Sequence, residues 1–211
     1  FIFGVAVATT IAKGLVDPAI VTVYVILGGL VGTILWVYFA TFKGIPISAS
    51  HSLIGGFVGA AFAKAGIDSL QIVGITKVLI FIVVAPVLGM IGGFIFFTLI
   101  MWIFRRASPS KINRWFRRLQ LISASSYAIT HGANDAQKTM GLITILLFST
   151  GFLEGEFFVP FWVIITSYAV IALGTLAGGW SVIKTMGMQL TKLRPVHGFC
   201  AESAGALVLA F

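Results

Sequence analysis

Long apolar stretches constrain the fold of this chain more than any other feature of its sequence. Residues 19–42, 72–104, 119–150 and 157–180 are predominantly hydrophobic, and a further apolar stretch opens near Val196. Several of these stretches reach the length that a helix needs to cross a bilayer. Charged residues make up only 9% of the chain, against about a quarter in a soluble domain. We therefore expect an all-α, multi-pass integral membrane protein of the cell (inner or plasma) membrane.

Two of the apolar stretches differ from a simple span. Residues 46–63, which begin PISASHSLIGG, are short and polar at their start, which favours a re-entrant or half-helix element. Residues 72–104 are too long for one simple crossing, and Pro86 is expected to kink or divide them. The sequence begins without Met and ends within an apolar stretch, so we expect it to be part of a longer polypeptide.

The basic residues are unevenly distributed. The formal net charge is +8, and six of the 14 basic residues lie in RRASPSKINRWFRR, residues 105–118. Loops rich in Lys and Arg beside membrane spans mark the cytoplasmic side. We therefore interpret residues 105–118 as a cytoplasmic linker facing lipid, and we expect the bilayer rather than nucleic acid as the partner. The single cysteine, Cys200, is interpreted as a small packing residue.

The segment HGANDAQKTMG, residues 131–141, places polar and charged side chains between two apolar flanks. Its Asn134, Asp135, Gln137 and Lys138 would be costly at membrane depth, which points to a functional site. Gly132 and Gly141 bracket these residues and predict a break in the helix. Asp135 with Asn134 could bind Na⁺, accept a proton or meet a protonated oxyanion. The alternative is a structural Asp–Lys pair that stabilises an irregular turn.

A second polar segment, PISASHS at residues 46–52, carries three hydroxyl side chains: Ser48, Ser50 and Ser52. Pro46 suits the first turn of a helix, and the N–H groups of a helix N-terminus bind anions. Serine hydroxyls would add donors for an oxyanion without adding a fixed charge. The alternative is an ordinary capped helix end, in which the serines bond the backbone.

One more acid lies within an apolar stretch, namely Glu202 in GFCAESAGA. It is a candidate coupling group for a cation or a proton, with a hydrated position near the membrane surface as the alternative. His51 and His131 are candidates for proton coupling because of their residue type, and a packing or hydrogen-bonding role is equally open.

These motifs resemble those of the inorganic phosphate transporter (PiT) family of cation-coupled permeases, in its bacterial form. HGANDAQKTMG is similar to the Gly-x-Asn-Asp signature of the family's second repeat, and PISASHSLIGG resembles the Pro-x-Ser-Thr-Thr-His element of its first repeat. Glu202 matches an acidic position that precedes the second copy of that element. The resemblance covers the whole chain, including the basic segment.

The resemblance implies an inverted-repeat secondary transporter with broken or re-entrant helices that imports phosphate with Na⁺ or H⁺ by alternating access. It implies an oligomer, no cofactor beyond the coupling ion, and a phosphate site that includes Ser48, Ser50, Ser52, Asn134, Asp135, Gln137, Lys138 and Thr139. Cation or proton coupling is expected at Asn134, Asp135 and Glu202. Ala49 stands where the family usually has a hydroxyl residue, which leaves sulfate open as the substrate.

On the same resemblance, residues 1–104 form the later part of the first repeat and residues 119–211 the earlier part of the second, joined by residues 105–118. The remaining copy of each motif is expected outside this sequence, so these residues alone should not transport. Two other classes remain as alternatives. An intramembrane hydrolase would use the serines, histidines and Asp135, but the neighbours Ser50 and His51 point in different directions on a helix. A non-transporting receptor would keep the fold and lack ion-dependent uptake.

Overall fold

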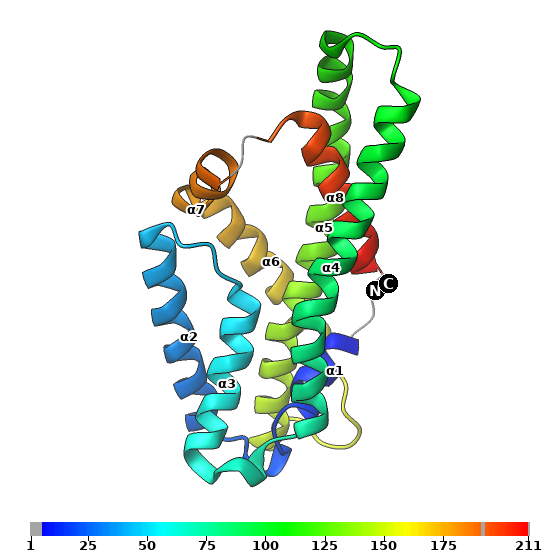
Figure 1. Cartoon of the computed structure of the whole chain (residues 1–211). Helices are drawn as coiled ribbons and strands as arrows, with labels where there is room; N and C mark the ends of the chain where they lie inside the picture. Colours follow the sequence, from blue (N-terminus) through cyan, green and yellow to red (C-terminus); the bar gives the residue numbers. More distant parts are fainter. Residues whose placement is uncertain (1–5, 191–192, 211) are drawn as a thin grey trace. The chain divides into compact units, whose positions relative to one another are not determined.

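The computed structural model describes residues 6–190 and 193–210, and in this part of the chain all regular secondary structure is helical (Figure 1). This confirms the predicted all-α class. The helices are α1 (Ala6–Gly14), α2 (Val23–Lys43), α3 (Ala49–Ala65), α4 (Ile72–Ile103), α5 (Pro109–Ser149), α6 (Phe161–Ala177), α7 (Trp180–Lys184) and α8 (Pro195–Ala210). Single-turn 3₁₀ helices lie at Pro18–Ile20 and Ile67–Ser69, and a π-helical stretch, Thr185–Leu190, follows α7.

The chain forms two compact units, and α4 and α5 each contribute residues to both. Among the described residues, the first unit contains 6–78 and 133–186, and the second contains 79–132, 187–190 and 193–210. In the first unit the core joins α1, α2, α3 and the second half of α5, with Ile11, Val25, Phe57 and Leu142 among its buried side chains. A smaller cluster in the same unit packs α1 and α5 against Val163 of α6.

Glycines allow α2 and α3 to pack closely. A Cβ atom on Gly56 would lie 2.4 Å from both the carbonyl oxygen of Gly29 and the hydroxyl of Thr33. The Thr33 hydroxyl donates to the carbonyl of Gly29 at 2.7 Å, and it also lies 3.1 Å from the carbonyl of Ser52 in the first turns of α3. Small residues let membrane helices approach through backbone atoms. This contact fixes the start of α3 against α2.

The second unit has its own apolar core at the end of α4. Ile100, Phe116, Val196 and Cys200 are buried together, from α4, α5 and α8. The ring of Phe116 makes edge contacts with Phe104 and Phe199, with centroids 5.7 and 5.2 Å apart. Cys200 is 3% exposed and packs in this core, as the sequence suggested.

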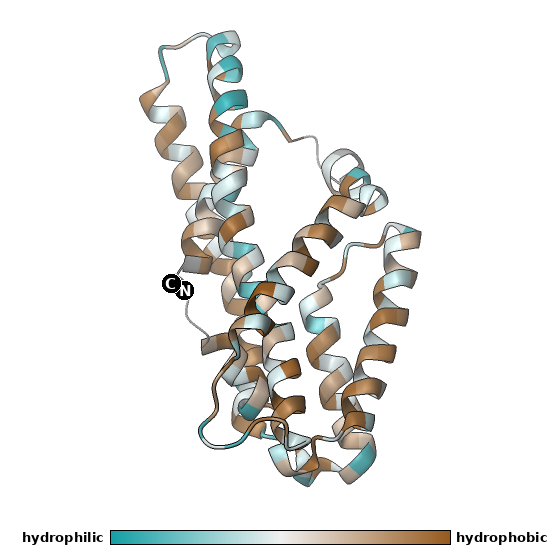
Figure 2. Ribbon diagram, turned by 180° about the vertical axis from the view of Figure 1, so that it is seen from behind, coloured by the Kyte–Doolittle hydropathy of each residue, from teal (hydrophilic) through white to brown (hydrophobic). Residues whose placement is uncertain are grey.

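Two helices in the described part of the chain, α2 and α4, are long and apolar enough to cross a membrane. Figure 2 colours the ribbon by hydropathy and shows that hydrophobic residues recur along the helices, and the most apolar part of α4 buries none of its residues. Taken together, α6 and Trp180–Gly187 are also long and apolar enough to cross a membrane, but the two segments meet at a bend of 62°. The bend follows from Gly178 and Gly179, whose φ angles of 154° and 99° strongly favour glycine. A broken helix therefore occurs here, whereas the sequence predicted a simple span over residues 157–180.

The predicted break within residues 131–141 is wrong, because α5 runs without interruption from Pro109 to Ser149. Gly132 keeps helical geometry, and Gly141 serves close packing, since a Cβ atom there would lie 2.5 Å from the carbonyl oxygen of Ala8 in α1. Pro86 does not divide α4 either.

Two further boundaries differ from the expectation. Pro46 lies two residues before the N-cap of α3, which is Ser48, rather than in its first turn. Residues 109–118 of the predicted linker are the first turns of α5, so the non-helical connection between α4 and α5 is confined to residues 104–108. The last apolar stretch does begin as expected, because α8 starts at Pro195 and contains Glu202.

Candidate functional site

The polar cluster of residues 131–141 lies on one continuous helix, α5, so its side chains point to different faces of the helix and differ in burial. Gln137 and Met140 are buried against the first unit's core, whereas Asn134, Asp135 and Lys138 are partly exposed. The side chains of Lys138 and Asp135 are 18% and 26% exposed. They are three residues apart, so the helical repeat places both on the same face of α5.

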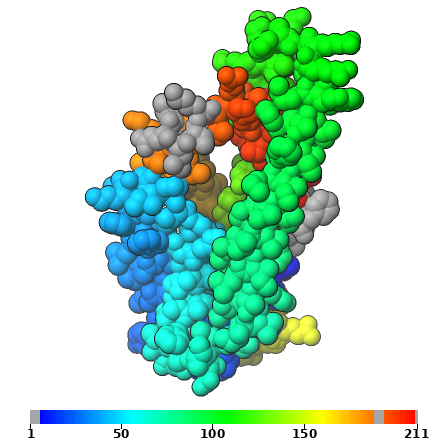
Figure 3. Space-filling model, viewed as in Figure 1, coloured from blue at the N-terminus to red at the C-terminus, as the bar shows by residue number. Residues whose placement is uncertain are grey.

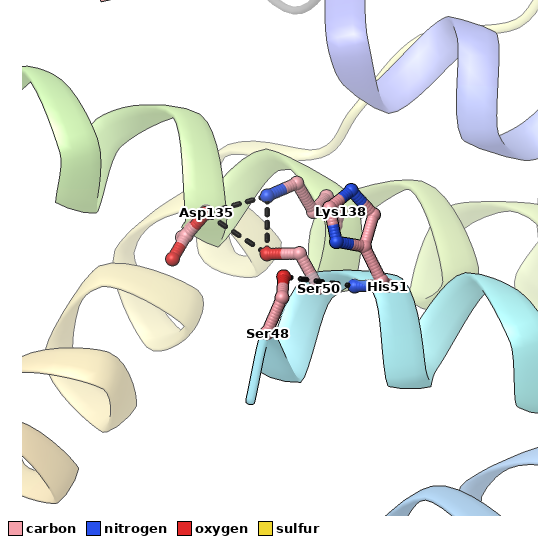
Figure 4. Close-up of polar contacts among 5 residues, drawn as sticks. All are labelled: Ser48, Ser50, His51, Asp135 and Lys138. Carbon is pink, nitrogen blue, oxygen red and sulfur yellow. Dashed lines mark hydrogen bonds and ion pairs between the residues drawn. The ribbon is translucent and has the colours of Figure 1, made fainter. Parts of the chain in front are cut away.

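Ser50 of α3 joins the two charged side chains of α5 (Figure 4). Its hydroxyl donates to Oδ1 of Asp135 at 3.1 Å and accepts from the ammonium of Lys138. Lys138 Nζ also forms an ion pair with the same carboxylate oxygen. The three groups therefore form a closed triangle of charge-assisted hydrogen bonds, which are stronger than neutral ones.

The other two serines of PISASHS bond the backbone instead. The Ser48 hydroxyl is the N-cap of α3 and accepts from the backbone N–H of His51 at 3.3 Å (Figure 4). The Ser52 hydroxyl donates to the carbonyl of Ser48 at 2.9 Å. In this structure the capped-end interpretation therefore describes Ser48 and Ser52, and the side chain of Ser50 is the one that faces the charged pair.

The triangle lies at the N-terminus of α3, which is 17 residues long. The first N–H groups of a helix have no partner within the helix, and the helix dipole adds a partial positive charge there. Lys138 adds a full positive charge, and Asp135 offsets it. An arrangement of this kind can accept an anion beside Ser50 and a cation beside Asp135 with little change in total charge. Among the described residues no three His, Cys, Asp or Glu side chains form a metal cluster, so a cation here would also need hydroxyl, amide or carbonyl oxygens.

Two residues of the sequence-based set lie in other surroundings. Gln137 is 1% exposed, and its side-chain oxygen accepts from the backbone N–H of Val7 at 3.1 Å, in the first turn of α1. Thr139 is exposed and lines a cavity of about 400 Å³ with residues of α5 and α6, including Thr166 and Ser167. The buried hydroxyl of Ser167 has no hydrogen-bond partner among the described residues.

Glu202 belongs to a separate polar cluster in the second unit. Its carboxylate accepts from the hydroxyl of Ser123 at 2.6 Å and from the amide of Gln120 at 3.5 Å, both on α5. The same stretch of α5 stacks Tyr127 on His131, with ring centroids 5.2 Å apart. Sequence reasoning missed Gln120 and Ser123. Their three-residue spacing on one helix face was the signal that could have found them.

The arrangement of Ser50 and His51 bears on the hydrolase alternative. The Ser50 hydroxyl is bonded to Asp135 and Lys138, and the side chain of His51 is exposed (Figure 4). The neighbouring serine and histidine therefore do not form a nucleophile–base pair in this structure.

Comparison with known proteins places this helical membrane fold in a family of transporters. The chain matches the phosphate transporter family over residues 1–111 and 104–211, and it belongs to that family. It is 50% identical over 207 residues to a probable low-affinity inorganic phosphate transporter of Rhizobium meliloti, covering 98% of this chain and 62% of that protein. A protein of the same description from Bacillus subtilis is 38% identical over 205 residues, covering 96% of this chain and 62% of the relative.

A solved structure described as the sodium-dependent phosphate transporter has the same fold. Its TM-score is 0.86 at 23% sequence identity, and the match covers 99% of this chain and 70% of that one. The chain thus spans less than two thirds of the length of the two bacterial relatives. These comparisons confirm the resemblance found in the sequence and the fold class predicted from it.

Proposed function

We propose that the full-length protein containing this chain imports inorganic phosphate together with Na⁺ or H⁺, by alternating access. The observation that carries this proposal is the triangle of Ser50, Asp135 and Lys138 at the N-terminus of α3. It combines the anion-binding end of a helix with a carboxylate, in a chain that belongs to the phosphate transporter family.

Phosphate would bind where α3 begins. Lys138 would exchange part of its bond with Asp135 for a phosphate oxygen, and the Ser50 hydroxyl would turn to donate to the anion. Ser48 and Ser52 would contribute through the same helix turn, with Asn134 and Thr139 nearby on α5. Gln137 would act indirectly, because its bond to Val7 holds α1 against the helix that carries the site.

The cation would bind beside the carboxylate of Asp135, which loses part of its bond with Lys138 when phosphate binds. Asn134 and Asp135 would supply oxygen ligands for Na⁺, or Asp135 would take up a proton. Glu202, held by Ser123 and Gln120, would serve as a second coupling group. The description of the similar solved structure as sodium-dependent supports Na⁺ as the coupling ion.

The setting follows from the apolar helices and the charge distribution. We place the protein in the cell membrane as a multi-pass protein, with residues 105–118 on the cytoplasmic side. Residues 1–104 and 119–211 would belong to two inverted repeats, and the assembled transporter would be an oligomer.

Radiolabelled phosphate uptake by the full-length protein in proteoliposomes tests this proposal. Uptake should follow an imposed Na⁺ or H⁺ gradient, and an excess of unlabelled sulfate should leave it unchanged. Asp135→Asn keeps the size of the side chain but removes its charge, and it should abolish or severely reduce uptake while the protein remains inserted. Uptake of Asp135→Asn at the parent rate would contradict the coupling role. Loss of phosphate uptake to competing sulfate would show that the site also accepts sulfate, in keeping with Ala49.

A further inference from the structure

The second unit contains a cavity of about 880 Å³ whose lining includes none of the proposed transport residues. It is formed where α4 ends and where α5 and α8 begin. Apolar side chains supply most of its lining, among them Phe97, Met101 and Val196, and two arginines, Arg105 and Arg194, lie beside them. No Asp or Glu is among its lining residues, so the charge that faces this cavity is positive.

The position of the cavity along α4 corresponds to the border between hydrocarbon and water. The most apolar window of α4 has a mean hydropathy of 2.7, and its helix ends at Ile103, directly before Arg105 and Arg106. Trp102 and Trp115, which lie on either side of the connection between α4 and α5, are 65% and 67% exposed. Exposed tryptophans and arginines of this kind mark the level of lipid headgroups. Figure 3 shows this segment, in green, on the molecular surface.

We propose that this cavity binds the headgroup of an anionic phospholipid. The lipid phosphate would lie between the guanidinium groups of Arg105 and Arg194, and the upper acyl chains would lie along Phe97 and Met101. Basic cavities between membrane helices at the headgroup level are suited to anionic lipids. The cavity fits an amphiphile better than inorganic phosphate, because most of its lining would offer a small hydrophilic anion no hydrogen bonds.

The surrounding charge supports an anionic rather than a zwitterionic lipid. Residues 105–118 contain six basic side chains and no acidic one. Arg105 also lies over the ring of Trp102, with its guanidinium carbon 5.6 Å from the ring centroid. That contact orients the side chain at the end of α4 while its N–H groups stay available in the plane of the guanidinium.

Native mass spectrometry of the detergent-solubilised full-length protein, titrated with phosphatidylglycerol, tests the proposal. The parent protein should retain one tightly bound phosphatidylglycerol and bind phosphatidylcholine much more weakly. The double variant Arg105→Gln with Arg194→Gln should lose about 25-fold in phosphatidylglycerol affinity, at about fivefold for each basic residue. The matched control is Arg117→Gln with Arg118→Gln, which removes the same charge from exposed positions of α5 that do not line the cavity. This control should keep the tightly bound lipid.

Three results would overturn the proposal. The first is a cavity variant that binds phosphatidylglycerol as tightly as the parent protein. The second is a control variant that loses as much affinity as the cavity variant, since the effect would then reflect overall charge. The third is displacement of the lipid by millimolar inorganic phosphate, which would make the cavity a site for the free anion. None of these measurements depends on transport, so they remain separate from the test of the proposed function.

Discussion

Replacing Ser50 by alanine is the most direct test of the triangle at the start of α3. The hydroxyl of Ser50 donates to Asp135 and accepts from Lys138, so its removal deletes two hydrogen bonds to charged groups at once. The backbone of α3 should be unaffected, because the N-cap is Ser48 and the Thr33 contact uses the carbonyl of Ser52. Ser50→Ala therefore changes the site without removing the contacts that position it.

The magnitude follows from the charge of the partners. A hydrogen bond to a charged group contributes about 1.5–3 kcal/mol, so loss of one such bond to bound phosphate should lower kcat/KM for uptake by about 10- to 150-fold. The fall should appear in initial rates of radiolabelled phosphate uptake into proteoliposomes by the full-length protein. Ser50→Thr retains the hydroxyl and should recover most of the activity.

The control for Ser50→Ala is Thr175→Ala on α6. Thr175 is exposed, and its hydroxyl donates to the carbonyl of Ile171 at 2.8 Å, so this variant removes a hydroxyl from a helix without touching the triangle. It should transport at the parent rate. If Ser50→Ala also transports within twofold of the parent rate, with equal amounts of inserted protein, the triangle is not part of the transport site.

Two further predictions concern the contacts that hold the first unit together. Gly56→Ala should lower the free energy of unfolding by about 1–3 kcal/mol, because its methyl group would collide with the backbone of α2. The control Gly59→Ala, on the same helix, places its methyl group in open space and should not destabilise the protein. Equal melting temperatures of the two variants would contradict the close packing. Gln137→Leu should destabilise the protein by about 1–3 kcal/mol, because the partly buried N–H of Val7 in the first turn of α1 loses its acceptor. Thermal melting in detergent measures this loss, and a melting temperature of Gln137→Leu equal to the parent's would refute this reasoning.

The sequence predicted the helical membrane fold and both polar segments of the first unit because hydrophobicity and charge are local properties. Apolar stretches predict spanning helices without any knowledge of their neighbours, and Asp135 is conspicuous among apolar residues wherever it lies. The same local reasoning failed for residues 131–141, where two glycines suggested a break. In the structure Gly141 is required for the approach of α1, which is a tertiary contact.

The roles of the individual polar side chains depend on partners that are distant in sequence. Ser48, Ser50 and Ser52 are equivalent in the sequence, and only the position of α5 separates Ser50 from the other two. The bond that Gln137 makes to α1 joins residues 130 positions apart in the chain. Pairings of this kind are set by three-dimensional packing, which a pattern within one helix does not contain.

The contact between α2 and α3 has a consequence for mutational tolerance. Because these helices meet through the backbone of Gly29 and Gly56 and through the Thr33 hydroxyl, the position of Ser50 hardly depends on the large side chains of α2 that face outward. Leu35 and Phe39, which are 67% and 50% exposed, should accept many apolar replacements. Such replacements would let the outer face of α2 suit membranes of different lipid composition. A saturation scan of α2 should therefore find its intolerant positions confined to the buried face of the helix.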